Sequence, residues 1–403
     1  MQSLSLTART GQWGRHAAAF LGFSIPISVA LDNTLLALVA VLWLASGDLK
    51  RKLAMVAANP VALAALALFG ILVAGLFYGT RYPGDGLNYL GKYDDLLFIP
   101  IFITLFEDAR MRELALRWFC AAMILTFAVA DITALGLLEG NPWLLRPLSY
   151  TGAFKASITH GLLAAFAAFL FALLALREAR WPQRVLFAVL ALIAIKNVAF
   201  IAISRTAYLV LALLALYLSF IVFRKRGLVI ACLILGGLFA AAYNVSGVFR
   251  ERVDTVVFES GDWQSRWPSR ESVTLRLEWY QRSLDIVRER PLLGSGTGSF
   301  PHAFAETVKD PKTAHLTNPH NEYLLIAVQT GLVGLALLLY LFVRQLTLAR
   351  RLSSPLETHL ARGLVITMAV GCLFNSMLLD HTEGLLFAWL TGVLYGGLRP
   401  QDA

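Results

Sequence analysis

The chain has 403 residues, of which 58% are hydrophobic and 15% are charged, and its formal net charge is +9. Soluble domains are about half apolar and about a quarter charged, so this composition excludes an ordinary soluble enzyme. The excess of Lys and Arg lies mainly in short segments between apolar runs and is not interleaved with aromatic residues. We therefore expect membrane lipids around the chain and no nucleic-acid partner.

Long apolar runs predict an all-α, polytopic membrane bundle of about 12 transmembrane helices, since about 18 or more apolar residues are typical of a span. In lipid, backbone hydrogen bonds are satisfied either within a helix or within a closed β-barrel, and apolar runs of this length favour the helix. The spans are expected at approximately 16–31, 34–47, 60–78, 94–107, 112–137, 157–176, 184–203, 206–223, 227–246, 320–343, 358–379 and 384–398.

Basic residues indicate how these spans are oriented. If the N-terminus is cytoplasmic, every loop on that side carries a basic cluster, such as Lys50-Arg51-Lys52 or Arg224-Lys225-Arg226, and the short outer loops carry few. Positive charge is retained on the cytoplasmic side, so both termini are expected there. The same rule makes the run 185–223 fold back on the outer side, where Ser204 is suited to cap a new helix.

The predicted domains follow from this topology. Residues 1–246 carry helices 1–9, residues 320–403 carry helices 10–12, and 247–319 form one large hydrophilic segment on the outer side. Within that segment, apolar residues of 273–290 recur at spacings of four and three, which predicts an amphipathic helix. Such a helix lies on the bilayer surface or caps the bundle.

The first candidate site residue is His320, in the sequence Asn318-Pro319-His320 just before an apolar run. Asn and Pro favour a helix start, so we expect His320 in the first turn of a membrane helix whose N-terminus faces outward. The positive end of the helix dipole disfavours a charged imidazolium. A neutral His here either acts as a general base or caps the span at the water interface.

Two arginines are further candidates on the outer side. Arg205 is expected in the first turn of a helix, where the dipole opposes its charge, so it either binds an anion or snorkels to lipid headgroups. Arg276 adjoins the apolar stripe of 273–290, and it either points into the bundle or forms an ion pair with Glu278 or another neighbour.

Two polar segments suggest sites but lack the rest of a motif. Gly294-Ser295-Gly296-Thr297-Gly298 has no following Gly-Lys-Ser/Thr, so a plain turn is expected and not a nucleotide loop. Asp380-His381-Thr382-Glu383 has metal-capable side chains, but no second cluster completes a site with recognised ligand spacing. We predict no metal and no other cofactor.

Five short stretches carry a resemblance to a known family. In chain order they are Ser204-Arg205-Thr206-Ala207, Arg276-Leu277-Glu278-Trp279, 290–300, 319–324 and 330–335. Together they resemble the O-antigen ligase and polymerase superfamily of bacterial membrane glycosyltransferases. The resemblance covers about 200–340 by motif and the whole chain by its number of spans.

The resemblance implies a GT-C-like O-antigen ligase of the inner membrane whose active site faces the periplasm. Such an enzyme transfers a glycan from undecaprenyl pyrophosphate to a lipid A-core sugar in lipopolysaccharide biosynthesis, with inversion and without metal. It implies that His320 is the base for the acceptor hydroxyl and that Arg205 and Arg276 bind the pyrophosphate, where cations stabilise developing negative charge. Asp380 would orient a cation or a sugar hydroxyl nearby.

Two alternatives remain from the sequence. An O-antigen polymerase of the same superfamily would use a second lipid-linked glycan as acceptor, but the length, the single large outer loop and the late His motif favour the ligase. A transporter of lipid-linked glycan would place charges along a path through the midplane. Lys196 and Asp131, within predicted spans, are the best evidence for it, because charges inside a membrane are costly and often functional.

Overall fold

The computed structural model describes residues 6–79, 83–137, 153–202, 204–245, 272–308 and 316–398, with a few residues between 247 and 258. Every described element is a helix, so the predicted all-α class is confirmed. Seven of the described helices are long and apolar enough to cross a membrane, or eight with one bent pair. The chain is thus a polytopic helical membrane protein.

The predicted number of twelve spans remains a prediction. Two of the expected spans are short helices in the structure, α6 (Asp95–Leu105) and α16 (His381–Tyr395). These have 11 and 15 residues, whereas a span needs about 20. Another pair, α2 (Val29–Ala45) and α3 (Leu49–Ala57), is bent by 113°.

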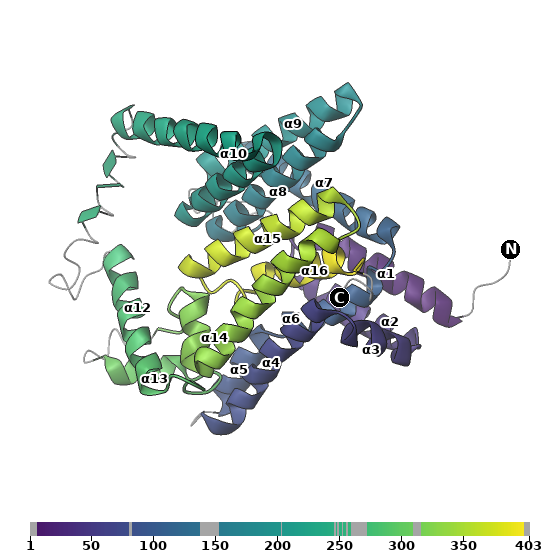
Figure 1. Cartoon of the computed structure of the whole chain (residues 1–403), viewed down its shortest axis with the longest axis vertical. Helices are drawn as coiled ribbons and strands as arrows, with labels where there is room; N and C mark the ends of the chain where they lie inside the picture. The colour runs from purple at the N-terminus through teal and green to yellow at the C-terminus, as the bar shows by residue number, and fades with distance from the viewer. Residues whose placement is uncertain are drawn as a thin grey trace.

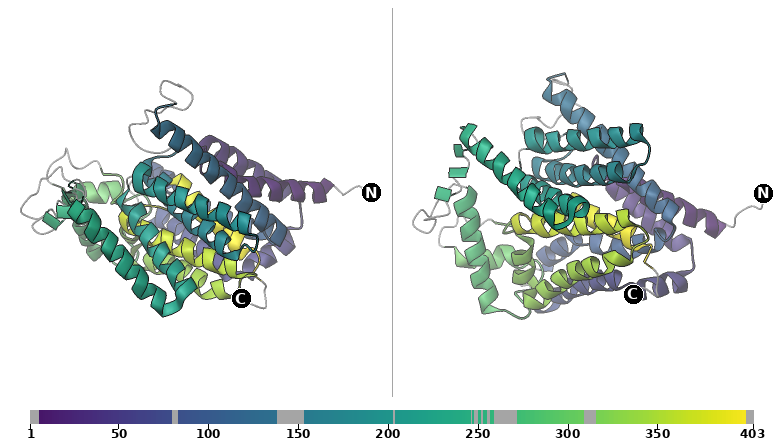
Figure 2. Two further views of the ribbon diagram at one scale, coloured as in Figure 1. Left: turned by 90° about the horizontal axis from the view of Figure 1, so that it is seen from above. Right: turned by 45° about the horizontal axis from the view of Figure 1, so that its top comes forward.

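Three C-terminal helices, α14, α15 and α16, form the centre of the bundle. Helices α8 and α10 pack against α15 on one side, and α4 and α6 pack against α14 and α16 on the other (Figures 1 and 2). The remaining helices are α1 (Leu6–Ser24), α4 (Pro60–Tyr78), α5 (Pro83–Lys92), α7 (Ala109–Ala134), α8 (Ser157–Arg177), α9 (Trp181–Lys196), the π-helix η2 (Asn197–Ala202), α10 (Arg205–Val245), α12 (Ser272–Glu289), α13 (Phe300–Thr307), α14 (Glu322–Leu348), the 3-10 helix η5 (Ala349–Arg351) and α15 (Pro355–Phe374).

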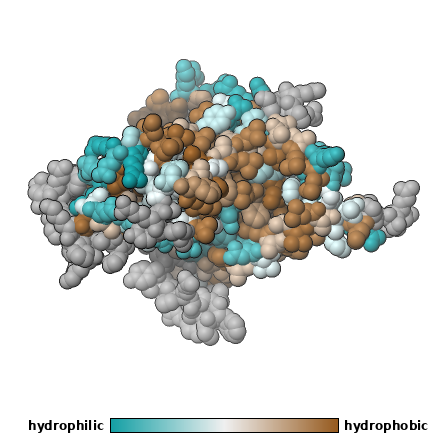
Figure 3. Space-filling model, turned by 90° about the horizontal axis from the view of Figure 1, so that it is seen from below, coloured by the Kyte–Doolittle hydropathy of each residue, from teal (hydrophilic) through white to brown (hydrophobic). Residues whose placement is uncertain are grey.

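The outside of the bundle is apolar. Large side chains such as Phe77, Phe200 and Leu233 are 85%, 77% and 71% exposed. In Figure 3 hydrophobic side chains gather over the middle of one face, and hydrophilic patches lie toward its edges. Contiguous apolar surface of this extent is unfavourable in water, so the lipid acyl chains are its natural solvent.

The predicted turn between Lys196 and Thr206 is confirmed. Helix α9 ends at Lys196, η2 follows, and α10 begins at Arg205. The Ser204 hydroxyl accepts a hydrogen bond from the backbone N–H of Ala207 at 3.4 Å, as expected of a helix cap. Further along, Arg224 has φ 58° and ψ −143°, so α10 consists of two helical segments joined at the predicted basic turn.

The predicted amphipathic helix is also present, as α12. It lies across one end of the bundle (Figure 1) and packs against α13 and α14. We call this end of the molecule the α12 end. The large hydrophilic segment 247–319 was predicted around it, and much of that segment falls outside the described residues.

The glycine-rich segment, residues 291–298, forms turns as expected, and it also packs into a break of a membrane helix. Helix α14 is broken at Gly331, which has φ 66° and ψ −164°. The segment fills this break: the N–H of Ser295 donates to the carbonyl of Val328 at 2.8 Å, and the N–H of Leu332 donates to the carbonyl of Pro291 at 2.8 Å. Backbone groups freed by a helix break must find such partners in a membrane. The segment is therefore an integral part of α14's packing.

Replacing Gly331 by Ala is expected to destabilise the protein. A Cβ at Gly331 would lie 2.2 Å from the carbonyl oxygen of Leu292, and its backbone conformation is one that is essentially restricted to glycine. Backbone strain alone costs about 1–3 kcal/mol. The measurement is thermal unfolding in detergent, with Gly70→Ala as control, because a Cβ at Gly70 meets nothing within 4 Å. Equal melting temperatures for the two variants would contradict the expected strain at Gly331.

Candidate functional site

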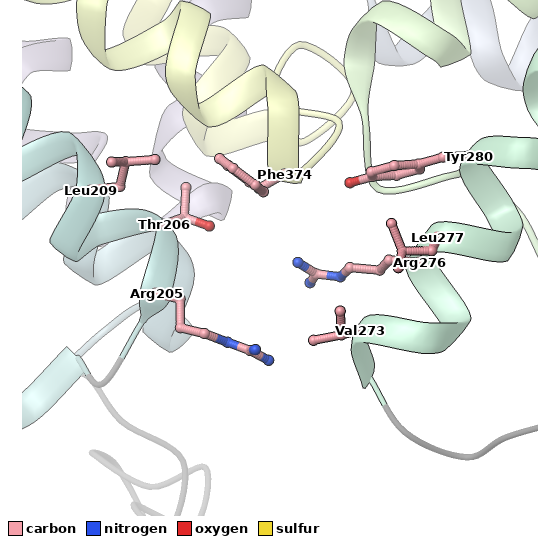
Figure 4. Close-up of a pocket in the computed structure, with 8 residues that line it drawn as sticks. All are labelled: Arg205, Thr206, Leu209, Val273, Arg276, Leu277, Tyr280 and Phe374. Atoms are coloured by element: carbon pink, nitrogen blue, oxygen red, sulfur yellow. The ribbon is translucent and has the colours of Figure 1, made fainter. Parts of the chain in front are cut away.

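A pocket of about 320 Å³ opens at the α12 end between α10, α12 and the end of α15. Figure 4 shows its lining residues as sticks, with the two guanidinium groups extending from opposite sides into the gap between α10 and α12. We call it the arginine pocket. Its lining residues are Arg205, Thr206, Leu209, Val273, Arg276, Leu277, Tyr280 and Phe374.

Arg205 and Arg276 enter this pocket from different helices. Arg205 begins α10, Arg276 lies near the start of α12, and both side chains extend into the opening between the helices (Figure 4). The pKa of Arg276 is lowered mainly by burial, and the charge of Arg205 lowers it too. Two guanidinium cations that face one pocket repel each other. A bound anion would convert this repulsion into attraction.

The alternative ion pair of Arg276 with Glu278 is not formed. Glu278 instead pairs with Arg282, one turn further along α12, at 2.6 Å. Because that carboxylate is engaged elsewhere, the Arg276 guanidinium remains directed at the pocket (Figure 4). A guanidinium presents planar donors that match two phosphate oxygens at once.

His320 is not in the first turn of α14, so that prediction was wrong. Helix α14 begins at Glu322, and its cap is Asn321, whose side chain accepts from the N–H of Leu324. The side chain of Asn318 accepts from the backbone N–H of His320 at 2.9 Å instead. His320 therefore lies just before the cap, with a left-handed φ of 52°. A non-glycine residue in this region is uncommon and is often found at functional sites.

The His320 imidazole is oriented by an amide and a carboxylate. Its Nδ1 lies 3.0 Å from Oδ1 of Asn375, and Nδ2 of Asn375 donates to Oδ2 of Asp380 at 3.1 Å. An ionised carboxylate only accepts, so the Asn375 amide N faces Asp380 and its oxygen faces His320. In neutral His320 the proton is then on Nδ1, and Nε2 is left as an acceptor.

His320 adjoins the arginine pocket but does not line it. Tyr280, which does line the pocket, has its hydroxyl 3.2 Å from the carbonyl oxygen of His320. The ring of Trp279 is 5.5 Å from the His320 ring. Trp279 and Tyr280 belong to the same helix as Arg276. Helix α12 therefore contributes side chains both to the arginine pocket and to the surroundings of the imidazole.

Asp380 reaches His320 through the side chain of Asn375. Burial raises the pKa of this carboxyl group, and the charges of His320 and Lys92 act in the opposite direction. Its contact with Asn375 places it in the chain of hydrogen bonds that ends on the imidazole. Sequence reasoning did not find Asn375, whose role depends on a contact 55 residues away from His320.

A known protein family matches the part of the chain that carries this site. Residues 190–339 match the family model described as O-antigen ligase. The matched segment contains Arg205, Arg276 and His320, which supports the resemblance seen in the motifs, and it ends before Asn375 and Asp380. No curated protein matches the chain in sequence.

Proposed function

We propose that the chain is an O-antigen ligase of lipopolysaccharide biosynthesis. The donor is a glycan on undecaprenyl pyrophosphate, and the acceptor is a sugar hydroxyl of lipid A-core at the periplasmic face of the inner membrane, with both termini cytoplasmic. The observation that carries the proposal is the arginine pocket beside His320, in a chain whose residues 190–339 match the O-antigen ligase family model. The glycan–pyrophosphate bond supplies the driving force, so the reaction needs neither ATP nor a nucleotide sugar.

The proposed reaction assigns one role to each part of the site. Nε2 of His320 takes the proton of the acceptor hydroxyl while its oxygen attacks the anomeric carbon. The bond from that carbon to the pyrophosphate oxygen breaks, and its electron pair leaves with the pyrophosphate. Arg205 and Arg276 stabilise the charge that develops there. Attack from the side opposite the leaving group inverts the anomeric centre.

Asn375 and Asp380 hold the imidazole in the tautomer that this role requires. Asn375→Ala is therefore expected to lower turnover by roughly tenfold or more, a part of the ~10²–10⁴-fold contribution of a general base. Donor affinity should not change, because Asn375 does not line the arginine pocket. Measuring kcat and donor Kd separately checks this. A variant with weakened donor binding and normal kcat would contradict the positioning role.

Reconstitution tests the proposed function. Purified protein in vesicles, with lipid-linked glycan and lipid A-core, should form the joined product in the presence of a chelator and without ATP. A polymerase would instead join two lipid-linked glycans when lipid A-core is omitted. Product that appears only in that second reaction would favour the polymerase and contradict the ligase.

The transporter alternative loses its best evidence. Lys196 and Asp131 form an ion pair at 2.6 Å, and the side-chain amide of Asn197 donates to the same carboxylate at 3.3 Å. Their charges compensate each other between α7 and the end of α9. Movement of glycan across the vesicle membrane without joining would nevertheless reject the enzyme.

A further inference from the structure

We propose that a second pocket at the α12 end binds a neutral sugar unit of the glycan substrates. This inference rests on the proposed function. The pocket has a volume of about 160 Å³ and lies between the C-terminal end of α12, the glycine-rich segment and α13. We call it the polar pocket. Its polar side chains are Glu289, Arg290, Ser295, Ser299, His302, Glu306 and Thr307.

The wall of the polar pocket is rigid. The N–H of Gly298 donates to the side-chain oxygen of Gln329 at 2.8 Å, and the N–H of Gly296 donates to the carbonyl of Gln329 at 2.8 Å. The hydroxyl of Thr297 donates to the carbonyl of Leu72 at 2.6 Å. A segment tied to α4 and α14 in this way presents the neighbouring side chains in fixed positions, which lowers the entropic cost of binding.

Ser299 indicates a hydroxyl-bearing ligand. The residue is only 8% exposed, and its hydroxyl has no hydrogen-bond partner among the described residues. It precedes α13 but does not cap that helix with its side chain. A buried hydroxyl left unpaired is unfavourable by about 1–3 kcal/mol. Because Ser299 lines the polar pocket, a ligand hydroxyl placed there would satisfy it.

The charges of the polar pocket favour a neutral ligand over an anion. Glu289 and Glu306 contribute two carboxylates against the single guanidinium of Arg290. His302, also in the lining, is engaged with the carboxylate of Asp85 at 2.6 Å. Carboxylates accept hydrogen bonds from sugar hydroxyls and repel phosphate. The polar pocket thus complements the arginine pocket, which favours the anionic part of the donor.

Helix α12 sets the separation between the two pockets. Arg276 and Glu289 lie near opposite ends of it, about 20 Å apart at 1.5 Å per residue. The sugar in the polar pocket is therefore not the one that reacts. It belongs either to a distal part of the donor glycan or to the core oligosaccharide of the acceptor, and both sources share the same hydroxyl-rich chemistry.

Calorimetric titration of the full-length protein with two probes separates these sources. The probes are the donor oligosaccharide and the core oligosaccharide, each freed of its lipid. One of them should bind wild type about five- to tenfold more tightly than Ser299→Ala or Glu306→Gln, the loss expected of one hydrogen bond. The control is Asp285→Asn, on the exposed side of α12, where Asp285 pairs with Arg288 outside the pocket.

The inference is overturned if neither probe binds wild type, or if both variants bind like Asp285→Asn while unfolding at the wild-type temperature. Transfer assays keep this result distinct from a failure of the proposed function. If only the polar-pocket assignment is wrong, wild type and variants join donor to lipid A-core alike. If the ligase function is wrong, wild type forms no joined product with any donor.

Discussion

Replacing His320 by Ala is expected to abolish glycan transfer while leaving the protein folded and able to bind donor. Its Nε2 is the one imidazole nitrogen left as an acceptor once Nδ1 faces Asn375. Loss of a general base lowers turnover by about 10²–10⁴-fold. The measurement is turnover of reconstituted protein with lipid-linked glycan and lipid A-core, together with donor Kd.

The matched control is His359→Ala. His359 lies near the beginning of α15, at the opposite end of that helix from Phe374 and the arginine pocket, and contacts the hydroxyl of Tyr217 at 2.9 Å. This variant should turn over like wild type. Wild-type turnover in His320→Ala would end the general-base hypothesis.

The arginine variants are expected to lose donor use. Arg205→Ala or Arg276→Ala removes one of two cations from the arginine pocket, and losing one preorganised charge-stabilising donor costs roughly 10²–10³-fold in rate. Lysine at either position should restore only part of the activity, because the planar fork of donors is lost. Donor affinity and turnover of each variant are the measurements.

Arg288→Ala serves as the control for charge on α12, since Arg288 is exposed and pairs with Asp285 away from the pocket. It should behave like wild type. If both alanine variants in the pocket kept normal donor affinity and rate, the pyrophosphate role would be lost.

Local sequence signals predicted the elements that carry the arginines. Ser204 marked the start of α10, and the spacing of apolar residues marked α12. Capping and periodicity are properties of neighbouring residues, so they can be recognised without knowing the fold. The orientation of Arg276 did not follow from the sequence, which left both the bundle and an ion pair open, because the choice depends on Glu278 pairing with Arg282.

The same reasoning failed where distant contacts decide. Asn318 and Asn321 are both good caps, and each also has a partner distant in the chain: the Ser376 hydroxyl donates to Asn318 at 3.3 Å, and the Asn321 amide donates to the carbonyl of Leu373 at 3.0 Å. The turns of the glycine-rich segment were expected, but their packing was not, because their partners are the backbone groups around Gly331. Asn375 was missed for a similar reason. None of these contacts leaves a periodic pattern in the chain.

A structure of the protein with undecaprenyl pyrophosphate bound would test the central claim most directly. The account predicts the pyrophosphate in the arginine pocket, with oxygens within hydrogen-bond distance of both Arg205 and Arg276 and with Nε2 of His320 facing the same space. Phosphates bound elsewhere, or an imidazole whose Nε2 faces away from them, would contradict it.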